Sequence, residues 1–455
     1  MIRPHQGRQA FIKIAYNGTA KLAVASDAAA ASSEEGKTQT YTVKSGDTLW
    51  GIAKKFYGKG TKYPAIYNAN VETIESTAKQ HGKKSSDNGH WIWPGEVLTI
   101  PDAEGDGSKS AESESVVVSL GEKIEQQMTG FSYTDVASGQ SDSVQITMHD
   151  IGMEWMGPLM PVRGAALGAA VWLANWGKAY PGTEIADSQQ TFTYGTFIID
   201  DITFSGAPTT CVLKGVSVPV NDDFKTKPKT VTWEKTTIKD IAEKLVSAAG
   251  VPLYYEGDSI QIKEYEQSKQ TDCAFLYSLC EKYGLAMKVY NQKIVIFDIA
   301  KYEAKAAVRT FSFTLNQITA AHGQVEQDIL KWSYNTTIDG TYTGVEFSYS
   351  DPNKDEPIKV TVGNAGRMYS ANAQASSKYD AELQAAAIVN AANRKIETMT
   401  LTIRADVSIV AGTCIQIAGL GKPDGKYFVD QAKHSVGSGY KMDLTMHKVQ
   451  APIKP

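Results

Sequence analysis

The chain has little cysteine, and its cysteines are not arranged for chemistry. Four are spread over 455 residues, at Cys211, Cys273, Cys280 and Cys414. Their spacing matches no metal-binding pattern. Cys273 and Cys280 are at helical spacing and are expected to be small apolar residues on one helix face. So few scattered cysteines favour synthesis in a reducing cytoplasm.

A catalytic constellation is also lacking. The seven histidines are dispersed, with no HExxH motif and no two at i, i+4 spacing. Asp200 and Asp201 end a predicted strand, where a solvated or capping role is favoured over acid–base catalysis. Gly419 and Gly421 form a turn without the strand-to-helix context of a phosphate-binding loop. The sequence therefore predicts no catalytic residue, no metal site, no cofactor and no enzyme activity.

Signals for nucleic acid and for membranes are equally scarce. The formal net charge is −4 at pH 7, and no basic cluster is longer than Lys83–Lys84, which argues against nucleic-acid binding. Residues 1–10 lack the apolar core of a signal peptide. The most apolar stretch, Ala165–Trp176, is too short to span a bilayer. The Gly/Ala-rich stretch from Pro158 to Trp176, flanked by Trp155, Trp172 and Trp176, predicts a buried hairpin or helix, or alternatively a subunit contact.

One stretch near the N-terminus carries a sharp motif. Tyr41 and Val43 alternate with polar residues as in a half-buried strand. Ser45–Asp47 is a turn, and Asp47 or Thr48 can cap a following helix. That helix has an apolar face of Leu49, Ile52, Ala53 and Phe56, and Ile66 and Ala69 repeat the pattern. Pro94 and Gly95 then turn the chain into a strand that Pro101 ends.

This order of elements resembles a LysM module, a small βααβ fold that binds glycan chains of peptidoglycan or chitin. The resemblance covers residues 40–102, with a longer polar gap than usual over Val71–Gly89. It implies a shallow groove between the first turn and the loop before the last strand, which either binds glycan or docks another protein. Alternatively, Trp93 and Leu49 are only core residues and the groove is empty. The groove residues implied are Gly46, Asp47, Thr48, Leu49, Trp93, Pro94 and Gly95.

The segments on either side of this module indicate that it is inserted into a β-domain. A strand over residues 10–16 ends at Asn17–Gly18, a strong hairpin signal. Residues 25–39 and 103–112 have the composition of linkers, and strands resume at Val116. Because a lone strand cannot satisfy its backbone groups, we expect residues 11–16 to pair within the β-domain that contains Val116–Met148.

Four later segments resemble the late-control-gene-D family of phage baseplate hub proteins. They are Phe131–Met148, Tyr194–Pro208, Thr232–Ala242 and Glu266–Gly284, and their order carries more weight than any one motif. Ile238, Ile241 and Leu245 form an amphipathic helix within this region. Residues 285–297 are predicted as a hairpin that turns at Asn291–Gln292.

The predicted fold class is α+β and β-rich. It is a hub of two β-barrel domains and an α+β middle domain, with the LysM domain inserted in the first barrel. The predicted divisions are a first barrel over 1–24 plus 113–225, linkers over 25–39 and 103–112, LysM over 40–102, the middle domain over 226–303, and a second barrel over 304–455 with a helix near 371–398.

The resemblance implies a structural baseplate hub of a contractile phage tail or tail-like particle, assembled in the bacterial cytoplasm as a homotrimer. The implied partners are the tail tube protein, the central spike protein, baseplate wedge proteins and the tape measure protein, with peptidoglycan as a further ligand of LysM. The alternative is a LysM-targeted cell-wall-binding protein or peptidoglycan hydrolase. The missing catalytic set and signal sequence, and the hub-like order of elements, favour the hub.

Overall fold

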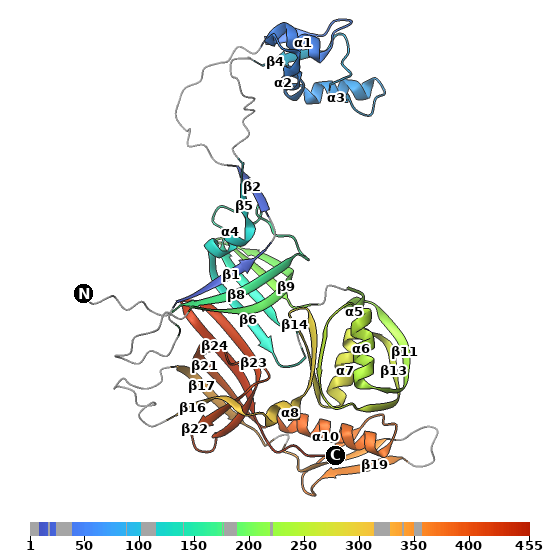
Figure 1. Ribbon diagram of the computed structural model, residues 1–455, viewed down its shortest axis with the longest axis vertical. Helices are drawn as coiled ribbons and strands as arrows, with labels where there is room; N and C mark the ends of the chain where they lie inside the picture. Colours follow the sequence, from blue (N-terminus) through green and yellow to red (C-terminus); the bar gives the residue numbers. More distant parts are fainter. Residues whose placement is uncertain are drawn as a thin grey trace, which may run out of the picture. The chain divides into compact units, whose positions relative to one another are not determined.

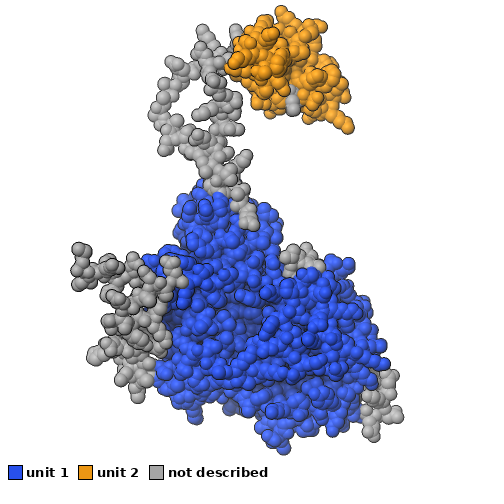
Figure 2. Space-filling model, in the orientation of Figure 1, with its two compact units in different colours: residues 1–20, 118–455 blue, residues 21–117 orange. Residues whose placement is uncertain are grey.

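The computed structural model of the chain describes residues 9–16, 19–23, 39–87, 89–101, 115–139, 141–174, 176, 189–218, 222–313, 328–338, 341–349 and 357–455. The chain forms two compact units, residues 21–117 and residues 1–20 with 118–455 (Figure 2). Each unit has its own hydrophobic core. The predicted linker residues 25–38 and 103–112 lie outside the described residues, and the predicted domain boundaries stay predictions.

The smaller unit is built on a two-stranded antiparallel sheet with helices between its strands. Its elements are β3 (Gln39–Thr42), α1 (Leu49–Tyr57), the 3-10 turn η1 (Gly60–Lys62), α2 (Tyr63–Ala69), α3 (Val71–Gln80) and β4 (Val97–Ile100). Leu49, Ile52 and Ala53 are buried, as the apolar face of α1 predicts. Ala69, by contrast, is exposed, and the buried residue at the end of α2 is Asn70.

Helix α3 is a third helix that the predicted βααβ order does not contain. It falls in the polar stretch that the sequence indicates only as a longer gap. Its buried face consists of just Ile74 and Ala78, one helical turn apart. The Asn70 amide fixes its start, because it donates to the carbonyls of Ile66 (2.7 Å) and Thr99 (2.8 Å).

The larger unit contains a 12-stranded sheet, and its first half has the strand order β1-β8-β9-β10-β7-β6 (Figure 1). The strands are β1 (Gln9–Ala15), β6 (Met128–Val136), β7 (Ser143–His149), β8 (Ala166–Ala174), β9 (Gln189–Ser205) and β10 (Thr210–Val216). Because β1 pairs antiparallel with β8 in the sheet that holds β6 and β7, the predicted pairing of residues 11–16 is confirmed. The Asn17–Gly18 turn lies outside the described residues.

Two further strands span the points where the chain passes between the two units. β2 (Thr19–Ala23) follows β1, and β5 (Ser115–Ser119) leads through α4 (Leu120–Gln127) into β6. β2 and β5 form a two-stranded sheet. The chain therefore leaves and re-enters the larger unit through neighbouring strands, as an insertion requires.

The second half of the large sheet is hydrogen-bonded directly to the first. β6 pairs antiparallel with β23, from Phe131 opposite Val436 to Val136 opposite Gln431. The two predicted barrels are thus joined in one continuous ladder, which local sequence pattern does not reveal. This half consists of β16 (Ala307–Ser312), β17 (Ile329–Thr336), β21 (Glu397–Arg404), β22 (Cys414–Ala418), β23 (Gly425–Gly437) and β24 (Gly439–Lys448).

The middle region packs two helices against two small sheets around a core of its own. Thr237 caps α6, accepting a 3.0 Å hydrogen bond from the Asp240 N–H, and Asn291 and Gln292 take positive φ in the predicted hairpin turn. The elements are α5 (Asp222–Thr226), β11 (Pro228–Thr237), α6 (Ile238–Ala248), β12 (Leu253–Glu256), β13 (Gln261–Thr271), α7 (Asp272–Lys282), β14 (Leu285–Tyr290), β15 (Lys293–Asp298) and α8 (Ile299–Ala304).

The predicted helix near 371–398 is α10 (Lys378–Asn393). It is shorter than predicted because β20 (Met368–Asn372) and β21 occupy the two ends of that range. α10 packs on the sheet that β20 forms with β18 (Gly344–Tyr349) and β19 (Ile358–Gly363) (Figure 1).

Candidate functional site

The two segments of the predicted LysM groove leave the same end of the β3–β4 ladder. Beyond the last pair, Thr42 opposite Val97, the Val43 N–H donates to the Glu96 carbonyl (2.8 Å) and the Gly95 N–H donates to the Val43 carbonyl (2.8 Å). The first turn and the Pro94–Gly95 turn are therefore held side by side by backbone hydrogen bonds.

In the first turn, the polar side chains mainly stabilise the turn itself. The Asp47 carboxylate accepts hydrogen bonds from the Lys44 N–H and the Tyr41 hydroxyl, both at 2.8 Å. These two contacts hold the pKa of Asp47 below its usual value. Thr48 caps α1 by accepting from the Gly51 N–H (3.1 Å). Gly46 has a φ of 88°, which a residue with a side chain rarely adopts.

Leu49 and Trp93 have less free surface than a groove-lining role suggests. The Leu49 side chain is 2% exposed, and a Cβ on Gly89 would come within 2.3 Å of it. Leu49 therefore offers a groove almost no surface. Trp93 is half-buried and stacks on His81, with ring centroids 4.7 Å apart and planes 5° from parallel. One face of its indole is thus already occupied.

Two exposed tryptophans outside the predicted set enlarge the surface that this unit can offer a ligand. Trp91 is 42% exposed, with the Lys83 ammonium 4.2 Å from its ring centroid. Trp50, on α1, is 52% exposed and lies beside Tyr63. The sequence signal for these two tryptophans is their position: Trp50 directly follows Leu49, and Trp91 lies two residues before Trp93. The sequence analysis assigned neither of them to the groove.

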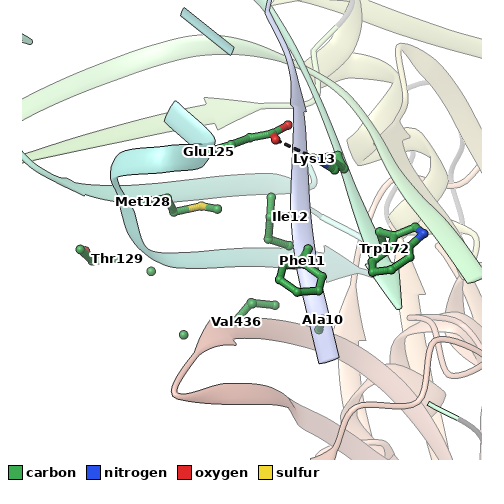
Figure 3. A pocket seen from close by; sticks show the side chains of 11 residues that line it. Ala10, Phe11, Ile12, Lys13, Glu125, Met128, Thr129, Trp172 and Val436 are labelled. Atoms are coloured by element: carbon green, nitrogen blue, oxygen red, sulfur yellow. Dashed lines mark hydrogen bonds and ion pairs between the residues drawn. The ribbon is translucent and has the colours of Figure 1, made fainter. Parts of the chain in front are cut away.

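A second candidate is an open cavity of about 530 Å³ beside β1 in the larger unit (Figure 3). Phe11, Trp172 and Met128 give it an apolar lining, while Lys13 and Glu125 form an ion pair (3.1 Å) at one end. Glu125 also accepts a hydrogen bond from the Ile14 N–H (2.7 Å). The lining thus combines an apolar surface with one ion pair.

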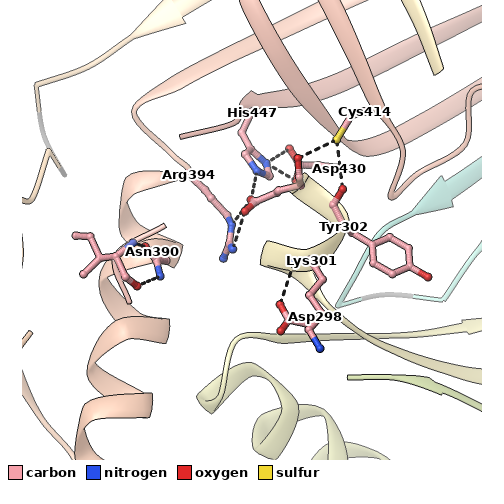
Figure 4. A network of polar contacts seen from close by, with 10 residues as sticks. Asp298, Lys301, Tyr302, Asn390, Arg394, Cys414, Asp430 and His447 are labelled. Carbon is pink, nitrogen blue, oxygen red and sulfur yellow. Dashed lines mark hydrogen bonds and ion pairs between the residues drawn. The ribbon is translucent and has the colours of Figure 1, made fainter. Parts of the chain in front are cut away.

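A third candidate is a buried polar network centred on His447 (Figure 4). Its Nδ1 bonds the Asp430 carboxylate (2.8 Å) and its Nε2 bonds Glu303 (2.8 Å), which also pairs with Arg394 (2.6 Å). Burial alone would lower the pKa of His447, but the two carboxylates outweigh burial and raise it. Because both ring nitrogens are occupied, the network clamps α8 and α10 to β23 and β24 and leaves no free base.

The remaining sequence candidates have structural roles. Asp201 forms an exposed ion pair with Lys214 (2.9 Å). The thiol of Cys414 is buried, and burial raises its pKa. Within the described residues, no group of three or more His, Cys, Asp or Glu side chains could hold a metal ion. No helix there is long and apolar enough to cross a membrane.

Two family models match separate parts of the chain. Residues 41–101 match the LysM domain family, and residues 312–447 match a family described as YQBQ-like. The Bacillus subtilis protein YqbP is 46% identical over 63 residues, and the Escherichia coli potassium binding protein Kbp is 42% identical over 65. Each alignment spans 14% of this chain and only 27% and 36% of those relatives.

Solved structures resemble most of the chain. A tail protein from Neisseria meningitidis aligns with a TM-score of 0.54 at 10% identity, over 74% of this chain and 94% of that protein. The 43 kDa tail protein of prophage MuSo2 from Shewanella oneidensis aligns with a TM-score of 0.51 at 11% identity, over 70% and 94%. Residues 41–101 are therefore a LysM domain, within a chain that has the fold of phage tail proteins.

Proposed function

We propose that this chain is a structural baseplate hub protein of a contractile phage tail or a phage tail-like particle, joining the tail tube to the central spike. The observation that carries the proposal is the shared fold, because the alignments extend over 94% of two tail proteins. The order of hub-like segments in the sequence supports it independently. The proposal assigns the chain no reaction to catalyse.

The joined sheet halves are consistent with a ring-shaped assembly of several copies of the chain. In the chain, the two halves lie side by side through the β6–β23 ladder. A homotrimer would place six such halves around one axis, which suits a tail tube of sixfold symmetry. We expect each interface between copies to bury more than ~2,000 Å². The tube and the spike would bind opposite faces of the ring, with wedge proteins and the tape measure protein as further neighbours.

For the LysM domain, we propose docking to other baseplate components, with peptidoglycan binding as the alternative. Two observations favour docking over a sugar groove. The Leu49 side chain lies in the core, and one face of Trp93 is covered by His81. Exposed Trp50 and Trp91 suit a protein contact, because tryptophan supplies large apolar contact area. If the ligand is glycan, several copies in one particle would strengthen weak single contacts.

A deletion separates the two roles. Removing residues 24–114 and joining β2 to β5 by a short Gly-Ser linker keeps the strand pair and eliminates the domain. Particles that no longer assemble a sheathed baseplate would support docking. Particles that assemble and contract normally, but no longer adhere to purified cell walls, would establish glycan binding instead. Trp93→Ala tests the predicted groove, whereas Trp50→Ala tests the exposed surface that docking would use.

A further inference from the structure

The last turn of α3 in the LysM domain reaches the turn that carries Trp93. His81 caps the C-terminus of α3, and its imidazole stacks on the Trp93 indole, with ring centroids 4.7 Å apart and planes 5° from parallel. Burial raises the pKa of Glu96 in the same turn, while the Trp93 N–H and the nearby Thr77 and His81 oppose that rise. Two residues at the end of α3 therefore lie against this turn.

His81 covers Trp93 from the solvent side. The His81 side chain is exposed and the Trp93 side chain is half-buried, so the imidazole is the outer ring of the pair. The neighbouring Trp91 makes a different contact, because His90 meets it at an interplanar angle of 89° and 42% of Trp91 remains exposed. The flat stack of His81 thus occupies an indole face that would otherwise be open to solvent.

The imidazole can leave the stack without unfolding α3. The His81 N–H donates to the Thr77 carbonyl (3.0 Å), and the Lys83 N–H donates to the Ala78 carbonyl (2.9 Å). Gly82 between them takes a φ of 74°, so the backbone itself closes the helix. Because an exposed side chain changes rotamer rapidly, the His81 ring is a movable cover on a fixed backbone.

The covered turn has two features that suit a sugar. The indole face of Trp93 attracts the C–H groups of a sugar ring, because aromatic faces carry negative partial charge. The Glu96 Oε1 atom is buried and has no hydrogen-bond partner among the described residues. A sugar hydroxyl or N-acetyl N–H is a donor of the kind that this oxygen lacks. Pro94 and Gly95 are exposed, so the turn is open to solvent beside the stack.

We propose that His81 is a lid on the glycan groove of the LysM domain. Its ring competes with a sugar ring for the same face of Trp93, and a glycan must displace it before it can stack. The inference rests on the proposed function of the LysM domain, because it gives the reason why this groove favours docking over glycan. It adds a residue outside the groove motif that sets the affinity for chains of N-acetylglucosamine.

The strength of the stack sets the size of the effect. A stacked aromatic pair stabilises the closed state by up to ~1.4 kcal/mol, which corresponds to a tenfold change in affinity. Glycan binds the open fraction of molecules, so the apparent affinity is lowered by that fraction. Removing the imidazole should therefore strengthen glycan binding roughly threefold to tenfold.

Glycan titration of the whole chain tests this inference. Isothermal titration calorimetry with the N-acetylglucosamine hexamer compares His81→Ala and His81→Asn, which both remove the ring, with His81→Phe, which keeps a flat ring. We expect the first two to bind roughly threefold to tenfold more tightly than the unsubstituted chain, and His81→Phe to bind like it. His90→Ala is the matched control, because it removes a second exposed histidine beside a tryptophan of the same domain.

The gain in affinity must depend on Trp93. Adding Trp93→Ala to His81→Ala should abolish the gain, and a gain that persists would overturn the lid. Equal affinities of His81→Ala and the unsubstituted chain would overturn it too. If no variant binds the hexamer, the groove takes no glycan and the inference fails, although docking to baseplate proteins would stand. Purified particles that lack the chain would instead refute the hub role and leave the titration result unchanged.

Proton NMR gives a second readout, of the lid itself. The stacked indole shifts the signals of the His81 ring protons, and His81→Phe identifies those signals by their loss. Saturating hexamer should move them towards the positions of an unstacked histidine, because the ring leaves Trp93. Signals that stay in place while the hexamer binds would show that glycan does not displace His81, contrary to the proposal.

Discussion

Phe11 lies directly opposite Trp172 in the β1–β8 ladder, with their ring centroids 5.5 Å apart. The whole LysM domain lies between these two residues along the chain. Their contact therefore ties the segment before the insertion to the sheet that follows it.

This pair should contribute measurably to the stability of the larger unit. Cross-strand aromatic pairs contribute about 0.5–1.5 kcal/mol beyond their buried area. We expect Phe11→Ala and Trp172→Ala each to lower the free energy of unfolding, with a coupling of that size in a double-mutant cycle. Chemical denaturation of the two single variants and the double variant measures it. Additive effects would show that the rings do not interact.

A second prediction concerns the buried ammonium of Lys288. It bridges Asp135 and Asp142, both buried, where the sheet meets β14. Lys288→Met would leave two buried carboxylates unpaired, at a cost of about 3–5 kcal/mol. Urea denaturation at pH 7 measures the loss. Lys214→Met, which breaks an exposed pair with Asp201, is the matched control and should change little.

The same variant has a predictable pH dependence. Burial already raises the pKa of Asp142 to about 7, and loss of Lys288 would raise it further. The defect of Lys288→Met should therefore shrink as the pH falls and Asp142 takes up a proton. Asp142→Asn should restore part of the lost stability at neutral pH. A defect that is constant between pH 5 and pH 8 would contradict this electrostatic account.

For His447, we expect the stability defect of a substitution to depend on pH in the opposite direction from that of Lys288→Met. Its folded-state pKa is raised by Asp430 and Glu303, so its stabilising charge is fully present below the unfolded value of about 6.5. It is lost as the pH rises through the higher folded-state pKa. His447→Gln should thus cost most stability at acidic pH and progressively less at alkaline pH. Thermal melts from pH 5.5 to 9 test this, and a defect that grows with pH would refute it.

The capping residue of α1 gives a prediction for the LysM domain. Thr48→Ala removes the acceptor for the Gly51 N–H and should destabilise that domain by about 1 kcal/mol. Thr48→Ser keeps the acceptor and should restore most of the loss. The melting transition of the LysM domain reports both variants, and that of the larger unit should not move.

The sequence pattern predicted those elements whose own residue spacing agrees with the way they pack in the fold. The spacing of Ile238, Ile241 and Leu245 predicted α6, and a lone strand in need of a partner predicted the pairing of residues 11–16. Helix α3 was missed because only Ile74 and Ala78 mark its buried face. The β6–β23 ladder was missed because it joins residues about 300 positions apart, where no local period constrains the pairing.

The candidate sites were harder to predict than the elements. Leu49 fits the groove by its place in the motif, but the approach of Gly89 buries its side chain. Residues 158–176 were expected to form a buried hairpin or helix, or a subunit contact. They form the end of the loop between β7 and β8 and then β8, which pairs on both sides. Sequence shows that such residues are apolar, but only the fold separates those that fill the core from those that face outward.

The most direct test of the central claim is to locate the chain in assembled particles. Electron microscopy of purified particles, with a label fused at the LysM domain, gives its position and copy number. The account predicts label density at the baseplate end of the tube, in three copies around the tail axis. Label distributed along the tube or sheath, or particles without label, would contradict the hub assignment.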